Sequence, residues 1–130
     1  MDNPRASILI AQGDRELALA PLLDREGYRV QETHDARPFL IEYSRMKPDL
    51  VVLDGDLPGG DAYMLCARLN EGEGITILML VPDHEESIDR AFRMGATDVL
   101  IKPVNPSQIW LALKRLTEGK RLVEGQFTRD

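Results

Sequence analysis

The sequence predicts an α/β fold, a doubly wound parallel sheet built from five strand–helix units. Short apolar runs rich in Val, Ile and Leu alternate with amphipathic stretches along all of the chain. These runs lack strict alternation, as expected for strands covered on both faces. The 130 residues suit one compact domain, and such units close right-handed with their site at the carboxyl edge of the sheet.

The five predicted strands are short runs separated by turn residues. They occupy residues 6–11, 28–33, 50–53, 75–81 and 98–101. The run at 28–33 alternates apolar and polar residues, which predicts a half-exposed strand.

The first helix is predicted to precede Gly27, with Leu19, Leu22 and Leu23 on its inner face. Pro21 lies inside this segment. Because Pro costs roughly 3 kcal/mol in a helix interior and little at the start, we expect the helix to begin near Pro21 or one turn before it.

Four more helices follow from apolar stripes and stop signals. Their inward residues are Phe39, Leu40 and Tyr43; Tyr63, Leu65 and Leu69; Ile88, Ala91 and Phe92; and Ile109, Leu113 and Leu116. Lys47-Pro48 predicts the end of the helix that carries Phe39, and Gly95 the end of the helix that carries Ala91. Pro106-Ser107 predicts the start of the last helix. Asp83 and Glu86 predict a capping box before the helix at 85–94.

Composition excludes several classes of function. A net charge of −6 argues against direct nucleic-acid binding, which needs a basic face. Cys66 is the single cysteine and there are two histidines, so we expect no disulfide and no zinc site. No apolar run is long enough to span a membrane and no signal peptide is evident, so we expect a cytoplasmic protein.

The chain divides into a domain at residues 1–118 and a segment at 119–130. The second segment is polar with scattered apolar residues, so it is either a terminal tail or the start of a linker to an output domain after Asp130.

Two motifs carry the candidate chemistry. Asp54 ends the apolar strand Leu50-Val51-Val52-Leu53 and is followed by the turn Gly55-Asp56-Leu57-Pro58-Gly59-Gly60. Lys102 follows the last predicted strand, in Gly95-Ala96-Thr97-Asp98-Val99-Leu100-Ile101-Lys102-Pro103. Both lie at the carboxyl ends of parallel strands, so a carboxylate and an ammonium can meet there.

These motifs resemble those of the receiver domain of two-component response regulators, over essentially residues 6–118. The resemblance implies a flavodoxin-like fold with strand order 2-1-3-4-5. It also implies that Asp54 is the phosphoacceptor for a histidine kinase and that Lys102 pairs with the phosphoryl group. Mg²⁺ would be held by acidic residues after the first strand.

The positions for that acidic pair are occupied by Gln12 and Gly13. Mg²⁺ needs an oxygen shell that usually includes a carboxylate, and neither residue supplies one. Asp14 comes one residue late, and Asp56 is the other nearby carboxylate. A metal site would therefore draw on Asp14, Asp54 and Asp56, and we expect Mg²⁺ binding to be weakened or absent.

Two further departures concern conformational switching. The resemblance implies a Ser or Thr after the fourth strand and an aromatic residue on the fifth. Val81 and Val99 stand there, and valine has no hydroxyl to bond a phosphoryl oxygen.

Two classes of function remain open. One is an atypical receiver in a phosphorelay, without an enzymatic role beyond residual self-phosphorylation. It would act through contacts with a histidine kinase or other signalling protein, or through a homodimer formed by the last strand and last two helices. The alternative is a working phosphoacceptor modified on Asp54. A flavodoxin-like nucleotide binder is disfavoured because Gln12-Gly13-Asp14 is not a glycine-rich phosphate loop.

Overall fold

The computed structural model describes residues 6–14, 19–72 and 74–125, with side chains described up to residue 118. Strands and helices alternate through these residues. The strands are β1 Ser7–Ala11, β2 Arg29–Thr33, β3 Leu50–Asp54, β4 Thr76–Val81 and β5 Asp98–Ile101. The helices are α1 Leu19–Arg25, α2 Ala36–Met46, α3 Ala62–Asn70, α4 Glu85–Arg93 and α5 Pro106–Gly125.

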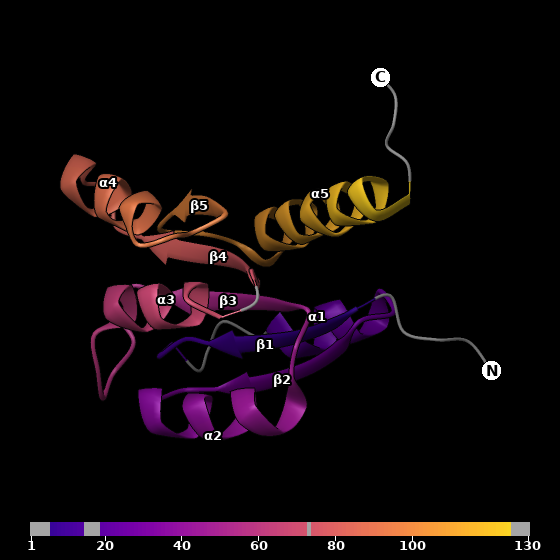
Figure 1. The fold of residues 1–130 in the computed structure, drawn as a ribbon, viewed down its shortest axis with the longest axis horizontal. Coiled ribbons are helices and arrows are strands. Elements are labelled where there is room, and N and C mark those ends of the chain that lie inside the picture. Colours follow the sequence, from indigo (N-terminus) through magenta and orange to yellow (C-terminus); the bar gives the residue numbers. More distant parts are fainter. Residues whose placement is uncertain (1–5, 15–18, 73, 126–130) are drawn as a thin grey trace.

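All strand pairings described are parallel, and the sheet has the order β2-β1-β3-β4-β5 (Figure 1). This confirms the predicted fold class and strand order. The register places Ala11 beside Leu53 and Asp54 beside Leu80, so the carboxyl ends of β1, β3 and β4 meet at one edge.

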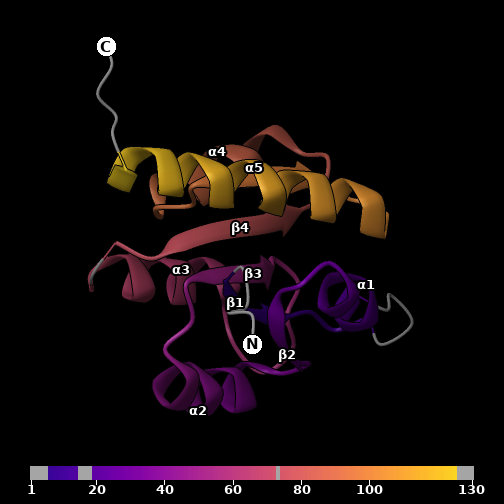
Figure 2. The same cartoon turned by 90° about the vertical axis from the view of Figure 1, so that its right-hand side faces the viewer.

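The sheet is covered on both faces by helices. Residues such as Leu9, Val51 and Ile77 face a core with α2, α3 and α4, whereas their neighbours Ile8 and Leu78 face a core with α1 and α5. Figure 2 turns the α1–α5 face toward the viewer. Because alternate strand residues enter different cores, the central strands are apolar between their end residues, as their sequence predicted.

Two helix starts differ in how they are capped. Asp61 precedes α3 and its carboxylate accepts from the backbone N–H groups of Tyr63 and Met64. His84 precedes α4 in an extended conformation and makes no side-chain cap bond. The capping box predicted from Asp83 and Glu86 was wrong, because Asp83 lies one residue before the position that caps the helix.

Helix α1 is described from Leu19 onward, directly after residues 15–18, so its late start stays a prediction. Pro21 is the third residue of the described part, and a proline costs little where it falls in the first turn of a helix. A start one turn before Pro21 falls partly on residues 15–18, outside the described residues.

Two further predictions concern the last helices. Phe92 was expected on the inner face of α4, but its side chain is 49% exposed, while Ala91 is fully buried. Ile109 and Leu113 of α5 are fully buried, as expected. Helix α5 continues through the predicted boundary at residue 118 to Gly125, and the division into domain and tail stays a prediction.

Among the described residues, no helix has both the length and the apolar character that crossing a membrane requires.

Candidate functional site

Asp54, Asp56 and Lys102 form an ion cluster at the carboxyl edge of the sheet. Lys102 Nζ lies 2.6 Å from Asp54 Oδ1 and 2.9 Å from Asp56 Oδ2. Asp54 is only 5% exposed, whereas the Asp56 side chain is 68% exposed. The one ammonium therefore balances a buried carboxylate and an exposed one.

The ends of the strands position this cluster. The Asp56 backbone N–H donates to Asp54 Oδ1 over 2.9 Å, which fixes the first turn after β3. The Lys102 backbone N–H donates to the Val81 carbonyl over 2.8 Å, which holds the lysine beside β4. Burial lowers the pKa of Lys102, but the hydrogen bonds and charges of Asp54 and Asp56 outweigh this effect and raise it.

Gln12, one of the two positions expected for an acidic pair, is 1% exposed and tied to strand β2. Its Nε2 donates to Glu32 Oε2 over 2.7 Å, and its Oε1 accepts from the Asp14 backbone N–H over 3.0 Å. His34 Nδ1–H donates to the Gln12 carbonyl over 2.9 Å. Both ends of the Gln12 amide thus have protein partners, and these partners stabilise the loop after β1.

Gly13, the second of these positions, lies against the turn that follows Asp54. A Cβ atom built there would be 3.0 Å from Pro58 Cδ, closer than ordinary contact. An aspartate at residue 13 would therefore require Pro58 to shift by a few tenths of an ångström.

A cavity of about 490 Å³ opens beside the ion cluster. It is lined by Gln12, Asp14, Asp54, Asp56, Leu80, Pro82, Asp83, Lys102, Pro103 and Val104. The structure thus brings the three predicted metal ligands, Asp14, Asp54 and Asp56, to the wall of one cavity. Across the described part of the chain, however, no three or more His, Cys, Asp or Glu side chains are grouped closely enough to hold a metal ion.

The residues present do not fit the Mg²⁺ site that the resemblance implies. Mg²⁺ requires near-octahedral oxygen ligands. Gly13 offers none, the Gln12 oxygen already accepts from Asp14, and the Asp54 oxygen Oδ1 accepts from Lys102 and Asp56. No chemical step is therefore assigned to a metal.

Val81 and Val99, the two predicted switch positions, lie on the face of the sheet covered by α2, α3 and α4. Val81 is fully buried in that core and Val99 packs against it. They sit on neighbouring strands, where Val99 pairs with Met79 and Val81 with Ile101.

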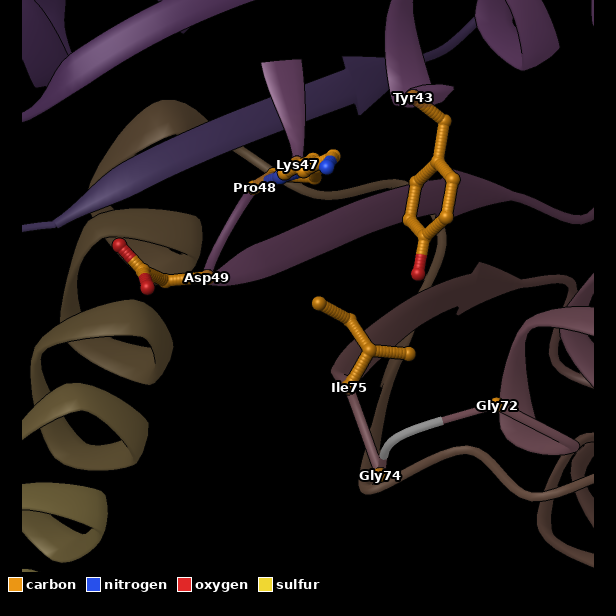
Figure 3. A pocket seen from close by; sticks show the side chains of 7 residues that line it. All are labelled: Tyr43, Lys47, Pro48, Asp49, Gly72, Gly74 and Ile75. Carbon is orange, nitrogen blue, oxygen red and sulfur yellow. The ribbon is translucent and has the colours of Figure 1, made fainter. Parts of the chain in front are cut away.

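A second hollow, of about 500 Å³, lies at the opposite edge of the sheet (Figure 3). It contains none of the predicted site residues and is lined by Tyr43, Lys47, Pro48, Asp49, Gly72, Gly74 and Ile75. Asp49 lies directly before β3, at the end of the strand opposite to Asp54. The Asp49 carboxylate accepts hydrogen bonds from the backbone N–H and the hydroxyl of Ser7. Its role there is to join the starts of β1 and β3.

Sequence reasoning missed the partners that hold the loops of the site. Glu32 and His34 were not predicted, although the carboxyl end of a parallel β2 beside β1 could have indicated them. Sequence reasoning also missed the ion pair between Arg90 of α4 and Asp61. Arg90 Nη2 lies 3.1 Å from Asp61 Oδ2. No local pattern signals that pair, since it joins the N-cap of α3 to a residue within α4.

Comparison with known proteins places this architecture among signalling proteins. The positive alginate biosynthesis regulatory protein of Pseudomonas aeruginosa is 32% identical over 106 residues, covering 80% of this chain and 43% of the relative. The DNA-binding response regulator MtrA of Mycobacterium tuberculosis is 31% identical over 112 residues, covering 84% of this chain and 49% of the relative. The chain thus spans less than half the length of these curated relatives.

Solved structures agree with these relatives. A two-component response regulator from Clostridium difficile superposes with a TM-score of 0.80 at 25% identity, over 86% of this chain and 95% of that one. The chemotaxis response regulator CheY4 of Vibrio cholerae shares the fold, with a TM-score of 0.79 at 23% identity, over 85% of this chain and 98% of that one. The family model of the response regulator receiver domain matches residues 8–114, and the chain belongs to this family of signalling domains.

Proposed function

We propose that this receiver domain signals through protein–protein contacts and that a standing ion cluster replaces Mg²⁺-dependent phosphorylation at Asp54. The observation that carries the proposal is the position of Lys102, whose Nζ lies 2.6 Å from Asp54 Oδ1 and 2.9 Å from Asp56 Oδ2. Removing the lysine from this cluster would leave a buried carboxylate without a counter-ion, which is costly.

Charge balance supports the proposal. Receiver domains usually bind Mg²⁺, and in phosphoryl transfer metal and lysine charges supply most of the stabilisation. Here the phosphoryl group would add negative charge beside Asp54 and Asp56, and Lys102 is the one ammonium that contacts both. Asp14 and Asp83 line the same cavity. With Gln12 and Gly13 in place of an acidic pair, we expect Mg²⁺ binding to be weak or absent.

The alternative function is a phosphoacceptor receiver modified on Asp54 by a histidine kinase. The shared cavity favours it, because Asp14, Asp54 and Asp56 all line the space beside Lys102. It requires Asp14 and Asp56 to approach Asp54 as metal ligands, because among the described residues these carboxylates are not grouped closely enough to hold a metal ion.

The partners that fit either function are signalling proteins. Receiver domains interact with histidine kinases and output domains, and we propose the same classes here, with an output domain following Asp130. The face formed by α4, β5 and α5 is a candidate for a homodimer contact, since Phe92, Ile101 and Leu111 are between 41% and 51% exposed. Direct nucleic-acid binding by residues 1–130 is not part of the proposal, because the net charge is −6.

The test is incubation with acetyl phosphate, and separately with beryllofluoride, with and without Mg²⁺. We expect no stoichiometric mass increase of the protein and no Mg²⁺-dependent ¹⁹F resonance from bound beryllofluoride. A receiver that carries both acidic residues after its first strand, treated in parallel, shows that the reagents are active.

Asp54→Asn is the matched variant of this chain. The proposal is overturned if the protein gains one phosphoryl group or one beryllofluoride in a Mg²⁺-dependent reaction that Asp54→Asn abolishes. That outcome would establish the alternative function.

A further inference from the structure

Tyr63 connects the turn after Asp54 with helix α4. The residue lies in the first turn of α3 and is 8% exposed. A Cβ atom built on Gly55 would lie 2.9 Å from the Tyr63 hydroxyl oxygen and 3.3 Å from the ring carbon that bears it. The Tyr63 ring thus occupies, together with the Leu80 carbonyl at 3.2 Å, the space that a side chain at residue 55 would need, so adding one there presses on Tyr63.

Arg90 of α4 holds the other side of Tyr63. Its guanidinium carbon lies 4.6 Å from the centre of the Tyr63 ring, within the range of cation–π attraction. Its Nη2 also donates to Asp61 Oδ2 over 3.1 Å. One α4 side chain thus contacts both the ring and the residue that caps α3.

Asp61 completes the connection to the α3 start. Its Oδ1 accepts from the Tyr63 backbone N–H over 3.0 Å and from that of Met64 over 3.3 Å. Burial raises the pKa of Asp61, but the Met64 hydrogen bond and Arg90 outweigh this and lower it. The carboxylate is therefore stabilised in the charged form that Arg90 needs.

The side chains of Val81 and Val99 cannot make hydrogen bonds that would connect the turn after Asp54 with α4. Val81 and Val99 lie in the same apolar core as Tyr63 and Ala91, and aliphatic side chains have no hydrogen bond to exchange. Tyr63 and Arg90 form directional contacts, whereas the valines contribute only packing.

We propose that Tyr63 and Arg90 are positioning residues that transmit movement of the Gly55–Asp56 turn to helix α4. The link does not depend on whether Asp54 is phosphorylated, so it goes beyond the proposed function. Any event that shifts the turn, including a partner that binds at the cavity beside Lys102, would change the attachment of α4 through the Tyr63 ring.

The experiment displaces the turn by Gly55→Ala and measures amide hydrogen exchange of α4, residues 85–93, without metal or phosphodonor. The added methyl group pushes on the Tyr63 hydroxyl, which should loosen Arg90 and raise α4 exchange by about tenfold. In the Tyr63→Leu and Arg90→Met backgrounds the same substitution should raise it by less than about twofold, because the link is already broken.

Two matched controls accompany this experiment. Gly60→Ala adds a methyl group in the same loop, but its Cβ would lie 3.0 Å from Ala36 of α2, so α4 exchange should not change. Arg93→Met removes an exposed arginine from α4, and in that background Gly55→Ala should keep its full effect.

A reciprocal measurement covers the case in which Gly55→Ala does not fold. Arg90→Met alone should raise exchange of the Gly55 amide, which donates to the Leu80 carbonyl over 2.8 Å, while Arg93→Met should not. The proposal is overturned if folded Gly55→Ala leaves α4 unchanged or acts equally in all backgrounds. If Gly55→Ala does not fold, the proposal is overturned when Arg90→Met and Arg93→Met change exchange of the Gly55 amide equally.

Discussion

The Asp54 side chain is buried, and its charge is balanced within the fold by an ammonium that it shares with Asp56. The sequence predicted that Asp54 and Lys102 could meet, because both follow parallel strands that end at one edge. It did not predict that Asp56 would be the second partner of the lysine. The sharing depends on the course of the turn after β3, which the Asp56 N–H bond to Asp54 fixes.

Cys66 illustrates a residue whose chemistry is set by burial alone. Its side chain is fully buried in the α2–α4 core, and burial raises the pKa of its thiol to about 11. At pH 8 about one Cys66 thiol in a thousand is therefore ionised, and only the thiolate is nucleophilic.

We therefore expect Cys66 to resist a thiol-specific reagent such as DTNB at pH 8 in the native protein. One thiol per chain should react within seconds to minutes after unfolding in guanidinium chloride. Rapid stoichiometric labelling under native conditions would contradict the burial of Cys66.

At the scale of single elements, the local sequence predicted where helices stop but not which residue caps α4. Gly27 and Gly95, predicted as helix stops, have φ values of 96° and 108°, which glycine adopts without strain. The start of α4 at Glu85 was predicted correctly, but its capping residue was not, because Asp83 and His84 are adjacent and only the backbone path decides which one holds the cap position. His84 holds the cap position, with φ of −149° and no side-chain bond.

The two caps give a paired prediction. Asp61→Ala should lower the free energy of unfolding by about 1 kcal/mol, since it removes the bonds to the α3 N–H groups. His84→Ala should change it by less than about 0.5 kcal/mol, and His84→Asp should raise it by about 0.5–1 kcal/mol by supplying the missing acceptor.

Urea unfolding monitored by circular dichroism measures these differences. Because Asp61 also pairs with Arg90, Arg90→Met serves as the control that isolates the ion pair from the cap. A loss in His84→Ala as large as that in Asp61→Ala would contradict the capping assignment.

At the scale of the whole molecule, the sheet brings residues from distant strands to a single edge. Lys102 and Asp54 are 48 positions apart in sequence, yet their side chains lie 2.6 Å apart. The stability of the fold is thereby linked to the ionisation of Lys102. Because the folded protein raises the pKa of this lysine above its ordinary value of 10.5, the charged form favours the native state.

This linkage predicts how stability depends on pH. The contribution of Lys102 should be fully present below about pH 10 and should be lost as pH rises through the folded pKa. The difference in unfolding free energy between the native sequence and Lys102→Met should therefore shrink at alkaline pH.

Urea unfolding at pH 7 and pH 11 gives this difference. Lys114→Met is the matched control, because Lys114 lies over the Trp110 ring rather than against a carboxylate. A difference for Lys102→Met that stays constant to pH 11 would show that the ion cluster adds nothing to stability.

The sequence by itself determined the fold class, the strand order implied by its family resemblance, and the edge at which Asp54 and Lys102 lie. It could do so because apolar periodicity and helix stops are local signals. Only the tertiary structure decided that Gln12 bonds Glu32, that Gly13 lies against Pro58, and that Arg90 of α4 holds Asp61 and the Tyr63 ring. Each of these contacts joins segments far apart in the chain, and the packing of whole elements, rather than any local pattern, brings them together.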